Sequence, residues 1–104
     1  MKSHAQMVVT ADRILLADFC SRHLIHRLSL FGSILGDDFR PDSDIDLLVE
    51  FEPGRKPGYI GLAAIERELS ALLGGRQLDV RTPEELSPYF RNDVLRNAEI
   101  LYES

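Results

Sequence analysis

The sequence of 104 residues predicts a small α/β domain in which helices pack on one face of a sheet. Apolar residues recur at helical spacing in three segments, and shorter segments between them alternate apolar with polar residues as strands do. Glycine and proline separate these segments. The expected order is helix, strand, strand, helix, strand, helix. We expect one domain over residues 1–104, with 1–9 as a loose N-terminal segment.

The first half of the chain is predicted to hold one helix and two strands. Thr10 can cap a helix that runs to about His26. The inward side of this helix carries Leu16, Phe19, Cys20 and Leu24. A short strand over 28–31 stops at Gly32, and a second strand covers 44–51. The second strand alternates cleanly, so one face is expected to carry Ile45, Leu47, Val49 and Phe51, and the other Asp44, Asp46, Leu48 and Glu50.

The second half begins with a loop over 53–58 that contains Arg55 and Lys56. The helix that follows has an apolar stripe and is expected to end at Gly74 and Gly75. That stripe consists of Leu62, Ile65, Leu69, Leu72 and Leu73. A third strand is predicted over 77–81, with Leu78 and Val80 facing the core and Gln77, Asp79 and Arg81 on the opposite face.

The last segment is predicted to be helical. Thr82 and Glu85 have the spacing of a capping box. Ser87 and Pro88 then supply an N-cap and a first helical residue. The apolar positions of this helix are Phe90, Val94, Ala98 and Leu101, which we expect to face inward.

The composition narrows the classes of function. Hydrophobic residues make up 44% and charged residues 28% of the chain, as in an ordinary soluble globular protein. No apolar run approaches the roughly 18 residues of a membrane span, and no signal peptide is recognised. One cysteine leaves no internal disulfide, so a cytoplasmic location is expected. The net charge of -5 argues against generic binding to nucleic acid.

Three carboxylates are the candidate catalytic and metal-binding groups. Asp44 and Asp46 lie two apart on one strand, so their Cα atoms are roughly 6–7 Å apart and their side chains leave the same face. Oxygen ligands of this kind suit Mg²⁺. Asp79 on another strand adds a third carboxylate, which is enough for two ions about 3.5–4 Å apart. These residues predict a metal-dependent phosphoryl or nucleotidyl transfer.

The pair Gly32-Ser33 is the candidate phosphate-binding element. Glycine lets the backbone approach a phosphate, and the following helical turn presents N–H groups to an anion. The Ser33 hydroxyl can donate to a phosphate oxygen. Neither a Gly-Ser pair nor an Asp-x-Asp is specific alone, but their combination at this spacing is.

The arrangement of these motifs resembles the signature of the DNA polymerase β-like nucleotidyltransferases. It consists of Gly32-Ser33, a spacing of ten residues, Asp44-x-Asp46 and then Leu47-Leu48-Val49. The segments "RPDSDIDLLVEF" and "LDVRTPEELSPYFRNDVLRNAEILYE" look like the minimal nucleotidyltransferase (MNT) family, over about 19–103. The resemblance implies a nucleotidyltransferase fold with a mixed sheet. It assigns Asp44, Asp46 and Asp79 to the metal-binding carboxylates, and Gly32 and Ser33 to the nucleotide phosphates.

The resemblance also implies a function and a partner. MNT proteins commonly act as the antitoxin of a HEPN-domain ribonuclease, using ATP and Mg²⁺ to attach AMP to a tyrosine of that toxin. A hetero-oligomer with the toxin is therefore expected. A tyrosine hydroxyl has a pKa near 10, so a carboxylate base is useful, and Asp79 is the candidate.

One departure from the family leaves alternatives open. Relatives often carry an arginine soon after Gly-Ser, whereas residues 34–38 here hold no base and two acids. Arg40 is the candidate that replaces it at the nucleotide, with Arg55 and Lys56 as further candidates. One alternative is an antitoxin of the same fold that blocks the toxin by binding alone. Another is nucleotidyl transfer to RNA, which the acidic net charge disfavours.

Overall fold

A computed structural model describes residues 13–36 and 43–104. Four strands form one sheet in the order β3-β2-β1-β4, with bounds β1 Ile25–Phe31, β2 Ile45–Phe51, β3 Leu78–Arg81 and β4 Glu99–Glu103. Strand β1 is antiparallel to both β2 and β4, while β2 and β3 are parallel. The sheet is therefore mixed, as the resemblance implied.

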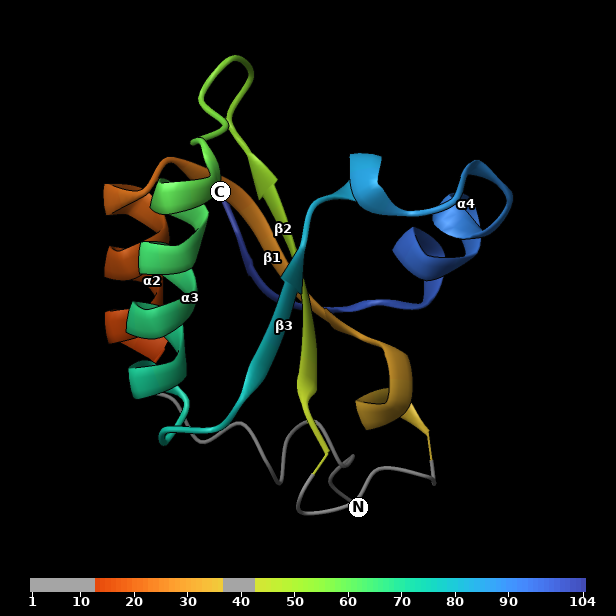
Figure 1. The fold of residues 1–104 in the computed structure, drawn as a ribbon, viewed down its shortest axis with the longest axis horizontal. Coiled ribbons are helices and arrows are strands. Elements are labelled where there is room, and N and C mark those ends of the chain that lie inside the picture. The colour runs from red at the N-terminus through yellow and green to blue at the C-terminus, as the bar shows by residue number, and fades with distance from the viewer. Residues whose placement is uncertain (1–12, 37–42) are drawn as a thin grey trace.

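Helices α2 (Arg13–Arg22) and α3 (Tyr59–Leu72) lie side by side on one face of this sheet (Figure 1). The core lies between them and the sheet. Its buried members include Leu16, Phe19, Cys20, Leu28, Leu30, Ile45, Leu47, Val49, Ile65 and Leu69. Ile45, Leu47 and Val49 of β2 are fully buried in this core, as predicted. Leu48, predicted on the opposite face, is fully buried as well, and Phe51 is only partly buried.

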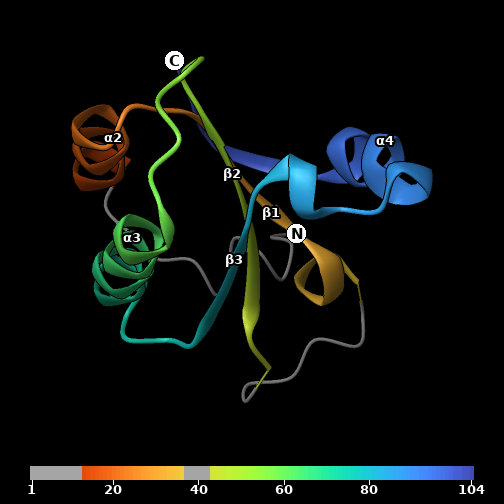
Figure 2. The ribbon, with the colours of Figure 1, turned by 45° about the horizontal axis from the view of Figure 1, so that its top comes forward.

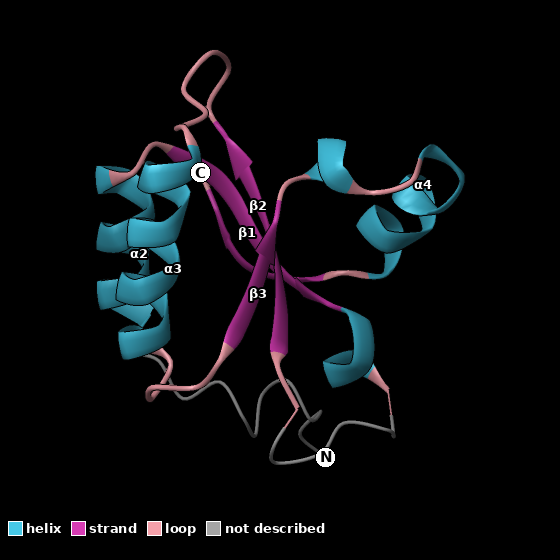
Figure 3. Ribbon diagram, viewed as in Figure 1, coloured by secondary structure: helices cyan, strands magenta, loops and turns pink. Residues whose placement is uncertain are grey.

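Helix α4 (Pro88–Asn97) lies on the other side of the sheet, together with the short turns η1 (Gly32–Leu35) and η2 (Pro83–Glu85) (Figures 2 and 3). Two of the three described helices thus share one face as expected, and the third does not. No residue of α4 is fully buried, and Phe90 is 64% exposed. The sheet face opposite α2 and α3 is consequently less covered, and it is the face that carries the candidate site.

The first helix is shorter than predicted. It ends at Arg22, and Leu24 adopts a left-handed conformation with φ 57° before β1 begins at Ile25. Pairing of Ile25 with Phe51 of β2 buries Ile25 completely, so the strand gains more from this segment than a longer helix would. Leu24 is 44% exposed rather than part of the core.

The last helix is also shorter, and a strand was missed. Helix α4 ends at Asn97, and the segment predicted to continue it forms β4. The helical spacing of Ala98 and Leu101 misled the sequence interpretation. In the fold, β4 provides backbone hydrogen bonds to β1, which would otherwise be an open edge, and Leu101 still packs against the core.

The capping box at Thr82 is confirmed. The Glu85 carboxylate accepts hydrogen bonds of 3.1 Å from both the backbone N–H and the hydroxyl of Thr82. Thr10 and the N-terminal segment 1–9 lie outside the described residues. Within the described part of the chain, no helix is long and apolar enough to span a bilayer.

Candidate functional site

Strand register brings two of the three candidate carboxylates together. Asp46 of β2 is paired with Asp79 of β3 in the parallel ladder, between the pairs Ile45–Leu78 and Leu47–Val80. Neighbouring strands lie about 4.8 Å apart, and paired residues point to the same face. Because Ile45, Leu47 and Leu78 are buried, Asp46 and Asp79 project from the opposite face. Asp44 immediately precedes β2 and is exposed.

The glycine of the Gly-Ser pair lies directly against Asp46. Phe31, the last residue of β1, pairs with Asp46, so the chain turns at Gly32 beside that carboxylate. Gly32 has φ +79°, and a Cβ atom at this position would overlap Asp46 Oδ2. Glycine is therefore required here both by the backbone conformation and by the space. The Ser33 side chain and Arg40 lie outside the described residues.

A basic residue, Arg81, lies beside the third carboxylate. Arg81 Nε is 3.4 Å from Asp79 Oδ2, and the two side chains are 46% and 41% exposed. Arg81 is two residues beyond Asp79 on β3 and so shares its face. The sequence placed Arg81 on this face but gave no reason to single it out. The signal was a basic residue at i+2 from the candidate aspartate.

A second arginine supports the start of β2. Arg76 Nη2 donates a hydrogen bond of 3.2 Å to the carbonyl of Ser43, and the backbone N–H of Ile45 donates to the Gln77 carbonyl at 3.0 Å. These two contacts hold the segment around Asp44 against the turn that leads into β3. The backbone around Asp44 is thus held from the side of β3.

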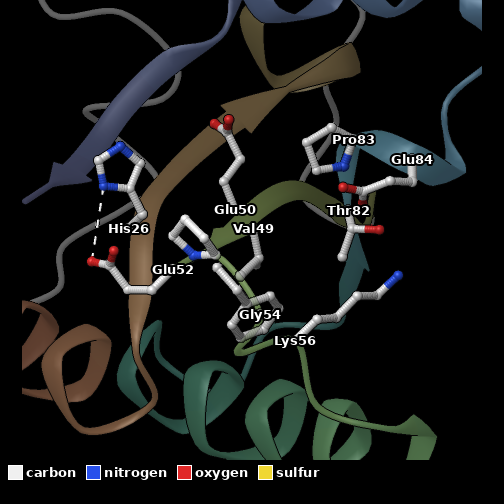
Figure 4. A pocket seen from close by; sticks show the side chains of 11 residues that line it. His26, Val49, Glu50, Glu52, Gly54, Lys56, Thr82, Pro83 and Glu84 are labelled. Atoms are coloured by element: carbon white, nitrogen blue, oxygen red, sulfur yellow. Dashed lines mark ion pairs between the residues drawn. The ribbon is translucent and has the colours of Figure 1, made fainter.

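The loop cations are at the wrong end of β2 to serve the carboxylates. Arg55 and Lys56 follow the last residue of β2, whereas Asp46 is its second residue, and five strand residues span about 17 Å. Lys56 instead lines a cavity of about 640 Å³ with Glu50, Glu52 and Glu84 (Figure 4). The aspartates do not line this cavity, which is predominantly acidic.

The candidate metal ligands are carboxylates, which are the ligand type that a hard divalent cation prefers, and two of them, Asp46 and Asp79, are paired across neighbouring strands. The carboxylates of Asp46 and Asp79 lie on one face of the sheet, next to the Gly32 turn, where Asp46 Oδ2 occupies the space that a Cβ atom would need. Among residues 13–36 and 43–104, however, no three acidic, histidine or cysteine side chains converge as a ready-made metal cluster. The Asp79 carboxylate lies 3.4 Å from Arg81 Nε, a cation of the protein itself.

The sheet is mixed, and it places a glycine turn beside paired aspartates on adjacent strands. This arrangement is typical of a class of phosphoryl-transfer domains. Comparison with known proteins gives the family. Residues 12–101 match the nucleotidyltransferase domain, and the chain belongs to this family. The resemblance stated from the sequence is thereby confirmed, and the chain is a nucleotidyltransferase.

Several relatives are similar over most of their length. A chain from Methanocaldococcus jannaschii, named among the protein adenylyltransferases, is 34% identical over 77 residues, which is 74% of this chain and 80% of the relative. The protein adenylyltransferase MntA of Thermococcus cleftensis is 33% identical over 78 residues, covering 75% and 74%. A solved structure described as a minimal nucleotidyltransferase superposes with a TM-score of 0.67 at 38% identity, over 83% of this chain and 85% of that one.

A toxin–antitoxin structure with AMP-PNP shares the fold. Its TM-score is 0.67 at 17% identity, over 89% of this chain and 74% of that one. At this identity the likeness establishes a common architecture only.

Proposed function

We propose that this chain is an antitoxin that transfers AMP from ATP to a tyrosine hydroxyl of a HEPN-domain toxin, with Mg²⁺, and so neutralises the toxin. The observation that carries the proposal is the pairing of Asp46 with Asp79 beside the Gly32 turn. The names of the two archaeal relatives as protein adenylyltransferases support the reaction class. The toxin–antitoxin structures of this fold support the partner, and hence a hetero-oligomer. The cytoplasmic location in this proposal rests on the single cysteine of the sequence.

Each candidate residue has a role in this scheme. Asp44, Asp46 and Asp79 would hold the metal ions, which would reduce the negative charge around the reacting phosphate. Gly32 lets the backbone approach the phosphates closely, while Ser33 and Arg40 contribute a hydroxyl and a positive charge. The nucleotide is thereby oriented with its α-phosphate at the aspartates.

Asp79 is the proposed base. Its carboxylate accepts the proton of the tyrosine hydroxyl, whose oxygen then forms a bond to the α-phosphorus as the bond to the β-phosphate oxygen breaks. The products are the AMP-tyrosine and pyrophosphate. For this step the Asp79 carboxylate has to leave Arg81, and the guanidinium then becomes available to the phosphates. Arg81 thus supplies a cation that the segment after Gly-Ser lacks.

Intact mass spectrometry tests the proposal directly. The purified protein is mixed with the HEPN-domain protein encoded beside it, ATP and Mg²⁺, and the partner is weighed. Steps of one AMP are expected, and the double substitution Asp44→Asn/Asp46→Asn should abolish them. Asp18→Asn is the matched control, because it removes an exposed carboxylate from α2, on the opposite side of the sheet.

The second candidate function is inhibition of the toxin by binding alone. It is favoured by the ion pair between Asp79 and Arg81 and by the lack of a convergent metal cluster in the described residues. The same experiment separates the two. A partner of unchanged mass that stays bound and inhibited, also by Asp44→Asn/Asp46→Asn, would favour binding alone.

A further inference from the structure

Arg76 lies in the turn that joins α3 to β3, at the end of the sheet where β2 begins (Figure 1). Its guanidinium reaches a segment 33 residues earlier in the chain, where Nη2 donates a hydrogen bond of 3.2 Å to the Ser43 carbonyl. Ser43 directly precedes Asp44, the candidate metal ligand that lies just outside β2. The contact of Arg76 therefore ends on the peptide group that leads into the candidate site.

Both peptide groups that flank Asp44 are held by hydrogen bonds. The carbonyl of the preceding group belongs to Ser43 and accepts from Arg76. The N–H of the following group belongs to Ile45 and donates to the Gln77 carbonyl at 3.0 Å. The two soft dihedral angles of a residue lie between its flanking peptide groups. Arg76 and Gln77, which are neighbours in the chain, thus restrict φ and ψ of Asp44 and with them the direction of its side chain.

The other two candidate carboxylates are placed in a different way. Asp46 and Asp79 are paired with each other in the parallel ladder of β2 and β3. Asp44 precedes this ladder and is exposed. The position of Asp44 consequently depends on the contact with Arg76 to a degree that the positions of Asp46 and Asp79 do not.

Arg76 is itself tied to the last turns of α3. The Ser70 hydroxyl donates to the Arg76 carbonyl, and the Gly75 N–H donates to the Ser70 carbonyl at 2.8 Å. The Arg76 side chain is partly buried. Because its backbone is already fixed, the arginine loses less conformational freedom when its planar guanidinium binds a carbonyl. A charged donor also binds a carbonyl more strongly than a neutral donor does.

We propose that Arg76 is a positioning residue of the metal site, which acts through the Ser43 carbonyl to hold Asp44 in place for binding a divalent cation together with Asp46. The inference rests on the proposed function, since it takes Asp44 as a metal ligand. It adds a residue that touches neither the metal nor the nucleotide and that sets the metal affinity of the site.

Titration with Mn²⁺ alone, followed by the electron paramagnetic resonance of the free ion, tests this role. Arg76→Ala should weaken Mn²⁺ binding about tenfold, because removal of a group that orients a metal ligand typically costs about 10–100-fold in affinity. Arg76→Lys keeps a charged donor and should retain more of the affinity. Arg13→Ala is the matched control, because Arg13 Nη1 also donates to a backbone carbonyl, that of Leu101 in β4, at 2.9 Å.

A double-mutant cycle separates positioning from a general loss of structure. In Asp44→Asn, where the ligand is already removed, Arg76→Ala should weaken Mn²⁺ binding by less than about twofold. Arg76→Gln keeps an N–H donor without the charge, and it replaces Arg76→Ala in the cycle if that variant does not fold. Amide hydrogen exchange should rise at Ile45 in the Arg76 variants and stay unchanged at Val49, in the interior of β2.

Each other result contradicts a defined part of the scheme. Unchanged Mn²⁺ affinity of Arg76→Ala, alongside weakened binding by Asp44→Asn, would overturn the positioning role and leave the proposed function standing. Equal weakening in both backgrounds would also overturn it, because the effect would then not pass through Asp44. A wild-type protein that binds no Mn²⁺, or Asp44→Asn/Asp46→Asn that binds it as tightly as the wild type, would overturn the metal site of the proposed function and the positioning role with it.

Discussion

Replacement of Gly32 by alanine should impair both the fold and the candidate site. Two costs add at this position. A non-glycine residue at φ +79° costs about 1–2 kcal/mol in free energy of unfolding. The new Cβ would also overlap Asp46 Oδ2, so either the turn or the carboxylate has to move. We expect a total loss of about 2–5 kcal/mol, since overpacking costs a further 1–3 kcal/mol.

Gly54→Ala is the matched control for the backbone cost alone. Gly54 has φ +75°, and a Cβ there would meet nothing within 4 Å. Urea unfolding of both variants measures the difference, which we expect to be at least about 1 kcal/mol. The double substitution Gly32→Ala/Asp46→Ala removes the overlapping carboxylate and should recover that difference.

AMP transfer by Gly32→Ala should fall more than its stability alone explains, because the displaced carboxylate is the proposed metal ligand. Equal unfolding free energies for Gly32→Ala and Gly54→Ala would refute the reasoning, because the overlap would then cost nothing. So would a double variant that is no more stable than Gly32→Ala.

Three further outcomes are expected. Arg81→Ala should lower AMP transfer about tenfold. It should change the free energy of unfolding by less than about 1 kcal/mol, because the ion pair with Asp79 is about half exposed. Arg81→Lys should retain more activity, and a loss of stability in place of activity would contradict this role. Leu28→Ala should cost about 2–5 kcal/mol by urea unfolding, because Leu28 is fully buried in the core; a loss below about 1 kcal/mol would show that the core is not packed as described. The Cys20 thiol should resist alkylation at pH 8 in the folded protein, since burial raises its pKa to about 12. The stability that the protonated thiol contributes is present below the pKa of the unfolded thiol and is lost as pH rises through about 12. Rapid alkylation without unfolding would refute the burial of Cys20.

Much of the fold followed from local patterns. The alternation of β2 predicted its buried face, and the capping-box spacing at Thr82 predicted a turn that the structure contains. The two shortened helices show where local patterns failed. Ile25 and the segment Glu99–Glu103 both fit a helix locally, but each gains more by pairing in the sheet. The helical spacing of apolar residues is a local pattern and does not indicate strand partners that lie far away in the chain.

The candidate site divides in the same way. The sequence by itself predicted the candidate residues Gly32, Asp44, Asp46 and Asp79, because their spacings and strand positions are typical of a nucleotidyl-transfer site. Only the tertiary structure decided their neighbours. The parallel register of β2 and β3 set Asp46 beside Asp79, and the same strand brought Arg81 to Asp79.

A cleft between η1 and α4, lined by Phe31 and Leu35 on one side and by Phe90 and Val94 on the other, also depends on the tertiary structure, since its two walls are more than fifty residues apart in the chain. The physical reason is common to all these cases. The type and spacing of side chains are local properties, whereas strand order, register and the position of α4 come from burying apolar surface and satisfying backbone hydrogen bonds across the whole chain.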